Sequence, residues 1–197
     1  MIEFMKMIMR DRCPADLDRC VEALAVVHHT DGYPLNWPVD PHGWLSPAGL
    51  LHAWIAEDPG GTLAGHLAVD RVTGPCPMEA VTVSTSADPP TSRPAAEVSR
   101  LFVVPAYRRQ AVGRRLLKQA QQWAGSRGLA LILEVVDDGR SGAVATYEAT
   151  GWQLNHLSQA DWTGPGGEPV RLRHYRYPSQ DDSGVTTADG ERAGGMR

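Results

Sequence analysis

A strand that ends at a proline and leads through an arginine-rich loop into a helix is the feature that most limits how this chain can fold. Residues 96–104, AEVSRLFVV, become apolar toward their end, which is typical of a strand in the middle of a sheet. Pro105 closes that strand. From Gln110 to about Ser126 the apolar residues recur at helical spacing. A strand followed this closely by a helix predicts a mixed α/β domain.

Basic residues gather in the same segment. Residues 100–118 hold six basic residues and no acidic one, although the whole chain carries 19 Lys and Arg against 23 Asp and Glu, a formal net charge of −4. A uniformly basic nucleic-acid-binding protein is therefore not expected. The segment is either the solvated face of a helix or a local anion site.

The start of the predicted helix favours an anion site. The first backbone N–H groups of a helix lack partners inside it and carry a partial positive charge, so they bind phosphate. Ala111 and Gly113 are small enough to let a phosphate approach the backbone. Arg108 and Arg109 can add charge-assisted contacts. The segment contains neither the Gly-Lys-Ser/Thr of a P-loop nor a GxGxxG fingerprint.

The remaining patterns predict one domain over residues 1–178. Pro14 lies near the first turn of a helical pattern that ends at about His28, and a second short helix covers 141–151. The segment 31–47 holds four prolines and is predicted to be a binding loop or lid. Residues 73–94 are predicted to be a mobile insertion with a short strand, and 179–197 a disordered tail. Strands are expected at 2–9, 52–57, 62–72, 96–104, 129–136, 152–157 and 170–177.

This element order predicts the α/β (α+β) class, with a largely antiparallel sheet that has a parallel part near 96–136. No apolar run reaches the roughly 18 residues of a membrane-spanning helix, and the short apolar start lacks a cleavage site for a signal peptide. Cys13, Cys20 and Cys76 form no Cys-x-x-Cys pair, which argues against a disulfide framework or a zinc site and suits the cytoplasm. No histidine pair has ligand spacing with a third ligand, so no metal is predicted.

Two blocks of the sequence resemble the GNAT superfamily of acyl-CoA-dependent N-acetyltransferases. The segment 108–113, RRQAVG, follows Val-x-Pro and resembles the family's CoA-binding motif, Arg/Gln-x-x-Gly/Ala-x-Gly/Ala. The second block, LILEVVDD…SGAVATYEATGW, resembles the family's next strand and helix and ends in its Tyr-Glu-x-x-Gly-aromatic pattern. Both blocks stand in the family's order and spacing. The resemblance is specific over residues 96–152.

The resemblance implies a mixed, mostly antiparallel sheet of six to seven strands with about four helices. It also implies a splayed parallel strand pair that holds CoA, the pantetheine arm pairing with backbone in that gap and the pyrophosphate resting on the start of the helix. Arg115 is expected beside the phosphates. The position often held by Asn in the second block is Arg140, whose side chain is expected to reach a phosphate. The implied cofactor-binding residues are Phe102, Val103, Val104, Arg108, Arg109, Gln110, Ala111, Val112, Gly113, Arg114 and Arg140.

The same resemblance implies direct acetyl transfer from acetyl-CoA to an amine, without a metal. Tyr147 stands where the family has its general acid, although it could simply pack on its short helix. Glu97 is the candidate general base, because some family members carry the catalytic Glu there; the alternative is an exposed carboxylate at a strand end. Strand alternation predicts that Glu97 shares a face with Ser99, Leu101 and Val103. Glu134 or water could act as the base instead. The Val103 N–H is the expected oxyanion donor.

The acceptor side is expected in the segment between the first two helices. Tyr33, Trp37, Asp40 and Trp44 combine aromatic walls with a carboxylate, which suits an amine or an organic cation, unless they only plug the core. His66 could also face this cleft. The expected acceptor is a small-molecule primary amine. Alternatives are a protein Lys or N-terminal acetyltransferase, a non-catalytic acyl-CoA-binding domain, and an enzyme that takes its acyl group from a carrier protein. The protein is expected to be a monomer or homodimer, with no nucleic-acid or membrane partner.

Overall fold

The protein is described by a computed structural model that covers residues 7–72, 94–139 and 142–178. Within these ranges it forms a seven-stranded sheet of order β1-β2-β3-β4-β5-β7-β6. Neighbouring strands are antiparallel, apart from the parallel pair β4 and β5. This architecture confirms the predicted fold class. The strands are β1 (Ile8–Asp11), β2 (Leu50–Glu57), β3 (Leu63–Arg71), β4 (Ala95–Val103), β5 (Ala130–Val136), β6 (Gln153–Thr163) and β7 (Pro169–Tyr177).

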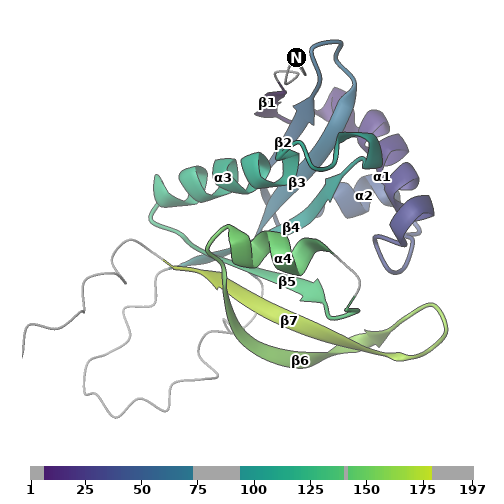
Figure 1. Ribbon diagram of the computed structural model, residues 1–197, viewed down its shortest axis with the longest axis vertical. Helices are drawn as coiled ribbons and strands as arrows, with labels where there is room; N and C mark the ends of the chain where they lie inside the picture. Colours follow the sequence, from purple (N-terminus) through teal and green to yellow (C-terminus); the bar gives the residue numbers. More distant parts are fainter. Residues whose placement is uncertain (1–6, 73–93, 140–141, 179–197) are drawn as a thin grey trace, which may run out of the picture.

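Helices cover both faces of this sheet (Figure 1). In the described residues they are α1 (Leu17–Asp31), α2 (Pro41–Leu45), α3 (Val112–Gly125) and α4 (Gly142–Ala149), with short 3-10 turns at Pro14–Asp16 and Pro105–Tyr107. One core cluster joins Leu116 of α3 and Tyr147 of α4 to Val98 of β4. The other joins Leu24 of α1 to Phe102. Since side chains alternate along a strand, the two clusters lie on opposite faces.

An extra residue in β4 reverses this alternation. Ser99 lies opposite Ala68 of β3, whereas Phe102 lies opposite His66, so β4 has one residue more than β3 in this stretch. The bulge is centred on Arg100, whose φ is 51°. Beyond it, Leu101 and Val103 pack on the α3–α4 core. Glu97 and Ser99 therefore share their face with Phe102, and the prediction that they share it with Leu101 and Val103 is wrong.

The parallel strands β4 and β5 pair over only part of their length. Their register joins Ala95–Val98 to Ala130–Leu133, and no pair is formed beyond Val98. β4 continues to Val103 on its pairing with β3, and β5 continues to Val136 on its pairing with β7. A gap therefore opens between the second halves of β4 and β5, as the splayed pair requires.

Most predicted elements are present, with shifted ends. β1 begins at Ile8, and residues 1–6 of the predicted strand lie outside the described residues. The breaker-rich segment 31–47 contains the short helix α2, because Asp40 accepts a hydrogen bond from Gly43 N at 3.0 Å and Pro41 occupies the first helical position. The predicted insertion, apart from Pro94, and the predicted tail also lie outside the described residues.

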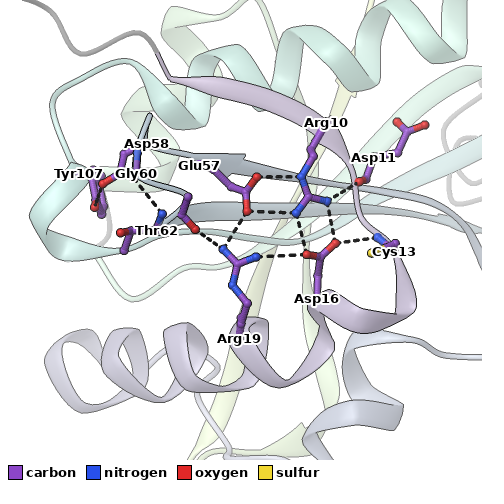
Figure 2. Close-up of polar contacts among 11 residues, drawn as sticks. Arg10, Asp11, Cys13, Asp16, Arg19, Glu57, Asp58, Gly60, Thr62 and Tyr107 are labelled. Atoms are coloured by element: carbon purple, nitrogen blue, oxygen red, sulfur yellow. Dashed lines mark hydrogen bonds and ion pairs between the residues drawn. The ribbon is translucent and has the colours of Figure 1, made fainter.

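Four charged side chains fasten α1 to the sheet, as Figure 2 shows. Arg10 of β1 lies 2.7 Å from both Asp16 and Glu57, and Arg19 of α1 lies 2.8 Å from Glu57. Hydrogen bonds from Arg10 lower the pKa of both carboxyls below their usual range. The same close-up shows Tyr107, whose hydroxyl donates to Asp58 at 2.7 Å and so ties the loop before α3 to the β2–β3 turn.

No helix within the described residues is long and apolar enough to cross a bilayer.

Candidate active site

The start of α3 has the features of an anion site. Arg109 and Ala111 both have left-handed backbone conformations, with φ of 61° and 59°. Ala111 is the N-cap, and its side chain cannot cap the helix. The first turn holds no acidic residue. The N–H groups at this end therefore carry their partial positive charge toward whatever lies before the helix.

Gly113 leaves space at this site. A Cβ added there would meet only Val103 Cγ2, at an ordinary distance of 3.5 Å. Packing against the described residues therefore does not require a glycine at this position. A glycine is required if a ligand approaches the backbone, which is what a pyrophosphate on these amides would do. The residues present thus fit the phosphate end of CoA.

The predicted phosphate-binding side chains are not all equally placed. Arg109 and Arg114 are exposed beside the start of α3. Arg108 instead forms a bidentate ion pair with Asp31 at the end of α1, and Gln110 donates to Ala106 O at 3.3 Å. Arg115 donates to Met7 O at 2.8 Å, so it holds the start of β1 rather than surrounding the phosphate site.

Arg140, the remaining predicted phosphate contact, lies outside the described residues.

Backbone groups along the β4–β5 gap differ in availability. Val104 N–H donates to Ala64 O at 2.9 Å, and Val104 O accepts from Tyr107 N at 2.9 Å. Neither group is left for a pantetheine arm, so the predicted contact of Val104 is disfavoured. Since backbone groups alternate in direction along a strand, Val103 N–H faces the gap, and Phe102 turns its groups toward β3. Val103 is the predicted backbone partner that this geometry favours.

Two tyrosines approach the gap from opposite faces of the sheet. Tyr147 of α4 is buried against Trp152 and Tyr175, with ring centroids 6.3 and 5.9 Å away. Tyr33 packs against the α1–α2 core. Burial raises the pKa of Tyr33, and the charge of Tyr147 raises it further. The two phenols are therefore electrostatic neighbours although they belong to different cores, which the opening between β4 and β5 allows.

The Tyr147 phenol keeps its proton at neutral pH. Burial raises the pKa of this phenol to about 12, with a further contribution from Tyr175. A group that stays protonated in a buried position can donate a hydrogen bond or a proton to a charge that develops beside it. Tyr147 thus has the chemistry that a general acid needs.

Two of the four predicted acceptor residues lie together. Tyr33 and Trp44 form an edge-to-face pair with centroids 6.2 Å apart. Trp37 lies apart, stacked on His28 at 5.0 Å and 39% exposed. Asp40 is exposed and caps α2 through Gly43 N. The carboxylate expected among these aromatic residues is therefore committed to a helix end.

Glu97 supplies a carboxylate on the acceptor side instead. It lies opposite Asp70 of β3, on the face that carries Phe102 and the α1–α2 core. Burial raises the pKa of Glu97 to about 7, and the charges of Glu134 and Asp70 raise it further. A carboxyl with this pKa is a stronger base than an exposed Glu and is still partly ionised at neutral pH.

Arg100, to which the sequence assigned no role, organises this side of the site. Its guanidinium donates to Asp70, to Ser99 Oγ at 2.8 Å and to Trp44 O. It also stacks over the Trp44 ring, 5.1 Å from the centroid. One side chain at the bulge thus joins β3, β4 and α2. Its position in a strand and its cationic neighbours gave no signal for these partners.

His66 lies beneath the bulge and not in the acceptor cleft. It is fully buried, and its Nδ1 lies 2.9 Å from Arg100 O while its Nε2 lies 3.1 Å from Arg12 Nη1. Arg12 can only donate, so Nε2 accepts and Nδ1–H donates to the bulge carbonyl. Burial lowers the pKa of His66 to about 3, which keeps the ring neutral.

The acceptor side is bordered by a contact between two distant segments. Asn36 Nδ2 in the α1–α2 connection donates to Thr163 O at the end of β6, at 2.9 Å. A hollow of about 430 Å³ lies beside this contact, between the α1–α2 connection and the β6–β7 turn. Its lining is His28, Gly32, Leu35, Asn36, Trp37 and Pro165.

In the described part of the chain no three His, Cys, Asp or Glu residues are grouped in a way that could hold a metal ion.

Comparison with known proteins connects this site to one family. The model of the acetyltransferase (GNAT) family matches residues 18–152. N-alpha-acetyltransferase RimI of Mycobacterium tuberculosis is 28% identical over 160 residues, which cover 81% of this chain and 86% of that protein. An uncharacterized protein of Mycobacterium leprae is also 28% identical over 160 residues. The matched part makes up only 38% of that relative, so this chain spans less than half of its length.

Solved structures show the same fold. The ribosomal-protein-S18-alanine N-acetyltransferase from Escherichia coli has a TM-score of 0.62 at 18% identity, covering 87% of this chain and 93% of its own. NAA60 of Arabidopsis thaliana in complex with acetyl-CoA has a TM-score of 0.67 at 15% identity, covering 87% of this chain and 99% of its own.

Proposed function

Because this chain belongs to the acetyltransferase (GNAT) family, we propose that it transfers the acetyl group of acetyl-CoA to the primary amine of a small molecule. One observation carries the proposal: Tyr147, Tyr33 and Glu97 come from different elements, and their charges or rings converge on the β4–β5 gap. A gap with an acid on one face and a base on the other suits acyl transfer.

The donor is assigned to the α3 end of the gap. Bound acetyl-CoA would supply an activated acetyl thioester. The free amides from Val112 onward, with the exposed Arg109 and Arg114, are suited to its phosphates. The Val103 N–H is the candidate donor to a carbonyl oxygen in the gap.

Glu97 is assigned the base role. An amine attacks only as the neutral form, so an incoming ammonium must lose a proton. The raised pKa of Glu97 and its place beside the gap support this assignment. Tyr147 is assigned the acid role, because its phenol stays protonated and can give a proton to the departing thiolate.

A small cationic acceptor suits the side of the site that carries Glu97. Asp70 and Glu97 provide negative charge there, and Tyr33 with Trp44 provides aromatic surface next to it. The bond from Asn36 to Thr163 closes this side laterally, which limits access for a bulky protein surface. The hollow of about 430 Å³ is in the range of small-ligand pockets, about 300–1,000 Å³.

The α-amino group of a polypeptide is the second candidate acceptor. The relative that favours it is N-alpha-acetyltransferase RimI, at 28% identity over most of both chains. A chain terminus is slender and could enter end-on past the same closure. Both candidates therefore present a primary amine at the end of a narrow group.

The acceptor can be identified by release of CoA thiol in a panel of amines. The panel contains small aliphatic, aromatic and sugar amines, short peptides with free α-amino groups, and an Nα-blocked lysine peptide. We expect turnover with small amines. Turnover with α-amino peptides alone would establish the second candidate, and no thiol release with any amine, at saturating acetyl-CoA, would contradict the acetyltransferase proposal.

Glu97→Gln should remove the acid limb of the pH profile. In the native protein kcat/KM should rise with pH around a value of about 7, because Glu97 accepts a proton only when it is ionised. The variant should lose this dependence and about a hundredfold in kcat/KM, measured by thiol release from pH 5 to 9. Glu22→Gln, at an exposed site on α1, is the control. An unchanged profile in Glu97→Gln would assign the base to Glu134 or to water.

A further inference from the structure

Titratable side chains form a row across five adjacent strands. The register places Asp70 of β3 opposite Glu97 of β4, and Glu134 of β5 opposite His174 of β7. His174 in turn lies opposite His156 of β6. Glu97 pairs with Ile132, which shares its face of β5 with Glu134. The row therefore stays on one face of the sheet, the face of Glu97, and ends at the edge strand β6.

His174 is the hub of the half of this row that the proposed reaction leaves unassigned. Its Nδ1 lies 3.1 Å from Glu134 Oε1, and its Nε2 lies 2.7 Å from Ser158 Oγ. Both ring nitrogens therefore have a polar partner, a carboxylate on one side and a hydroxyl on the other. This connectivity lets a proton enter the ring at one nitrogen while another leaves from the second.

His156 holds this ring in place. The two imidazoles are stacked with centroids 4.1 Å apart and planes at 7°, and Asn155 Nδ2 lies 3.2 Å from His156 Nδ1. Rings stacked in parallel direct their lone pairs side by side and not toward a common point, so this pair is not arranged for a metal. Two stacked imidazoles also disfavour a double positive charge.

The hub is connected electrostatically to the proposed base. Glu134 is the first of the two charged neighbours that raise the pKa of Glu97, and Glu134 also opposes the lowering of the His174 pKa by burial. His174 is 9% exposed, whereas Glu134 has 38% of its side chain exposed. Glu134 thus stands between a buried base and a buried imidazole, with access to solvent.

We propose that Glu134, His174 and Ser158 form a proton relay that carries the proton of the acceptor ammonium from Glu97 to solvent at the β6 edge. The inference rests on the proposed function, whose base it extends. The ammonium gives its proton to Glu97, and Glu97 passes one through water to Glu134. His174 accepts this proton at Nδ1 and releases the Nε2 proton to Ser158, whose own hydroxyl proton goes to water. One proton moves, and no covalent bond between heavy atoms changes.

The groups that face His174 are named by the register and contacts of the strands beside it. Glu134 faces it from β5, and His156 and Ser158 face it from β6. On its own strand, Arg176 shares the same face. Glu134 raises the His174 pKa, whereas burial and His156 lower it. His174 is accordingly a positioning residue, which acts on the reaction through Glu134 and Glu97.

The relay is tested by His174→Ala with imidazole added to the buffer. We expect kcat at saturating substrates to fall roughly tenfold and to recover as the imidazole concentration rises, because a free base replaces the missing proton carrier. Glu134→Gln should cause a similar fall. The control is His52→Ala, since His52 also pairs with a carboxylate, Asp11, at 2.9 Å, but packs on Trp123 of α3. A kcat unchanged within twofold, or a fall that imidazole does not reverse, would overturn the relay.

A second measurement does not depend on turnover. NMR titration of the full chain should show that Glu134→Gln lowers the pKa of both His174 and Glu97, since the Glu134 charge raises both. Unchanged values would overturn the relay. If native protein acetylates no amine while both pKa values respond, the proposed function fails and the coupled network stands. A stable acetyl group on Ser158 in the intact mass would make Ser158 a nucleophile and would also overturn the relay.

Discussion

Arg100 connects more of the site than any residue that the motifs single out. Its left-handed backbone creates the bulge that turns Glu97 and Phe102 to one face. Its side chain then binds Asp70 and Trp44, and its carbonyl lies 2.9 Å from His66 Nδ1. A non-glycine residue with positive φ stores strain, which persists because the surrounding contacts hold it. These contacts are what keep Glu97 and Tyr33 near the same gap.

Gly113 allows a direct test of the donor site at the scale of one residue. Gly113→Val should weaken CoA binding at least tenfold, because the branched side chain occupies the space in front of the α3 amides. Stability should change by no more than about 1 kcal/mol, because a Cβ at this position meets only Val103 at 3.5 Å. Calorimetric titration with CoA and thermal unfolding measure the two effects. Gly113→Ala, with one methyl group, should bind within threefold of the native protein; equal binding of both variants would contradict the assignment.

At the scale of elements, the contact between β3 and α3 positions the donor site. Gly65 of β3 lies under the first turns of α3, where a Cβ would come within 2.9 Å of Phe102 O and 3.2 Å of Val112 Cγ1. The glycine therefore lets the helix start lie directly on the sheet. Tyr107 adds a second tie through Asp58. The position of the α3 amides is thus set by β3 and the β2–β3 turn, and not by the cationic loop alone.

Gly65→Ala should destabilise the protein and impair the donor site together. Overpacking of this kind costs roughly 1–3 kcal/mol, and Val112, which a Cβ at Gly65 would crowd, is the first residue of α3. The free energy of unfolding in urea and the affinity for CoA should therefore both fall. Gly142→Ala, at the start of α4 where a Cβ meets nothing within 4 Å, is the control. Normal CoA affinity in Gly65→Ala would separate the α3 start from this contact.

For the whole molecule, buried titratable groups divide the acid response into two ranges. Asp16 and Glu57 have lowered pKa values because of Arg10, so their contribution is present above their ordinary values near 4 and is lost only as the pH falls below them. His66 acts in a higher range, because burial lowers its pKa from 6.5 to about 3. The unfolded chain takes up this proton below pH 6.5, and the folded chain does not, so stability falls as the pH decreases from there.

His66→Gln should flatten the pH dependence of stability between pH 7 and pH 5. The native protein should lose about 2 kcal/mol more than the variant over this range, from the pKa difference of His66. A glutamine keeps one donor for Arg100 O and one acceptor for Arg12 without titrating. Urea unfolding at several pH values measures the difference, with His52→Gln as the control. Equal slopes for the native protein and His66→Gln would show that His66 titrates in the folded state.

Periodicity and end signals in the sequence were enough for most of the fold. Pro14, Pro105 and Gly128 mark boundaries that the described elements respect within a few residues. Helix α2 was missed because Pro41 was taken for a breaker, although proline is favoured at the first position of a helix that Asp40 caps. The cationic segment was seen as one unit, but the structure divides it. Arg108 and Arg115 hold α1 and β1, while Arg109 and Arg114 remain exposed beside the start of α3.

The sequence by itself determined the order of elements, the parallel strand pair and the backbone site at the start of α3, because each depends on patterns within a few neighbouring residues. Only the tertiary structure decided which side chains meet at the gap. The extra residue at Arg100 reverses which face Glu97 shares, and the contacts of Arg100 with Asp70 and Trp44 span 30 and 56 positions. Such contacts depend on register and packing between distant segments, which no local pattern encodes.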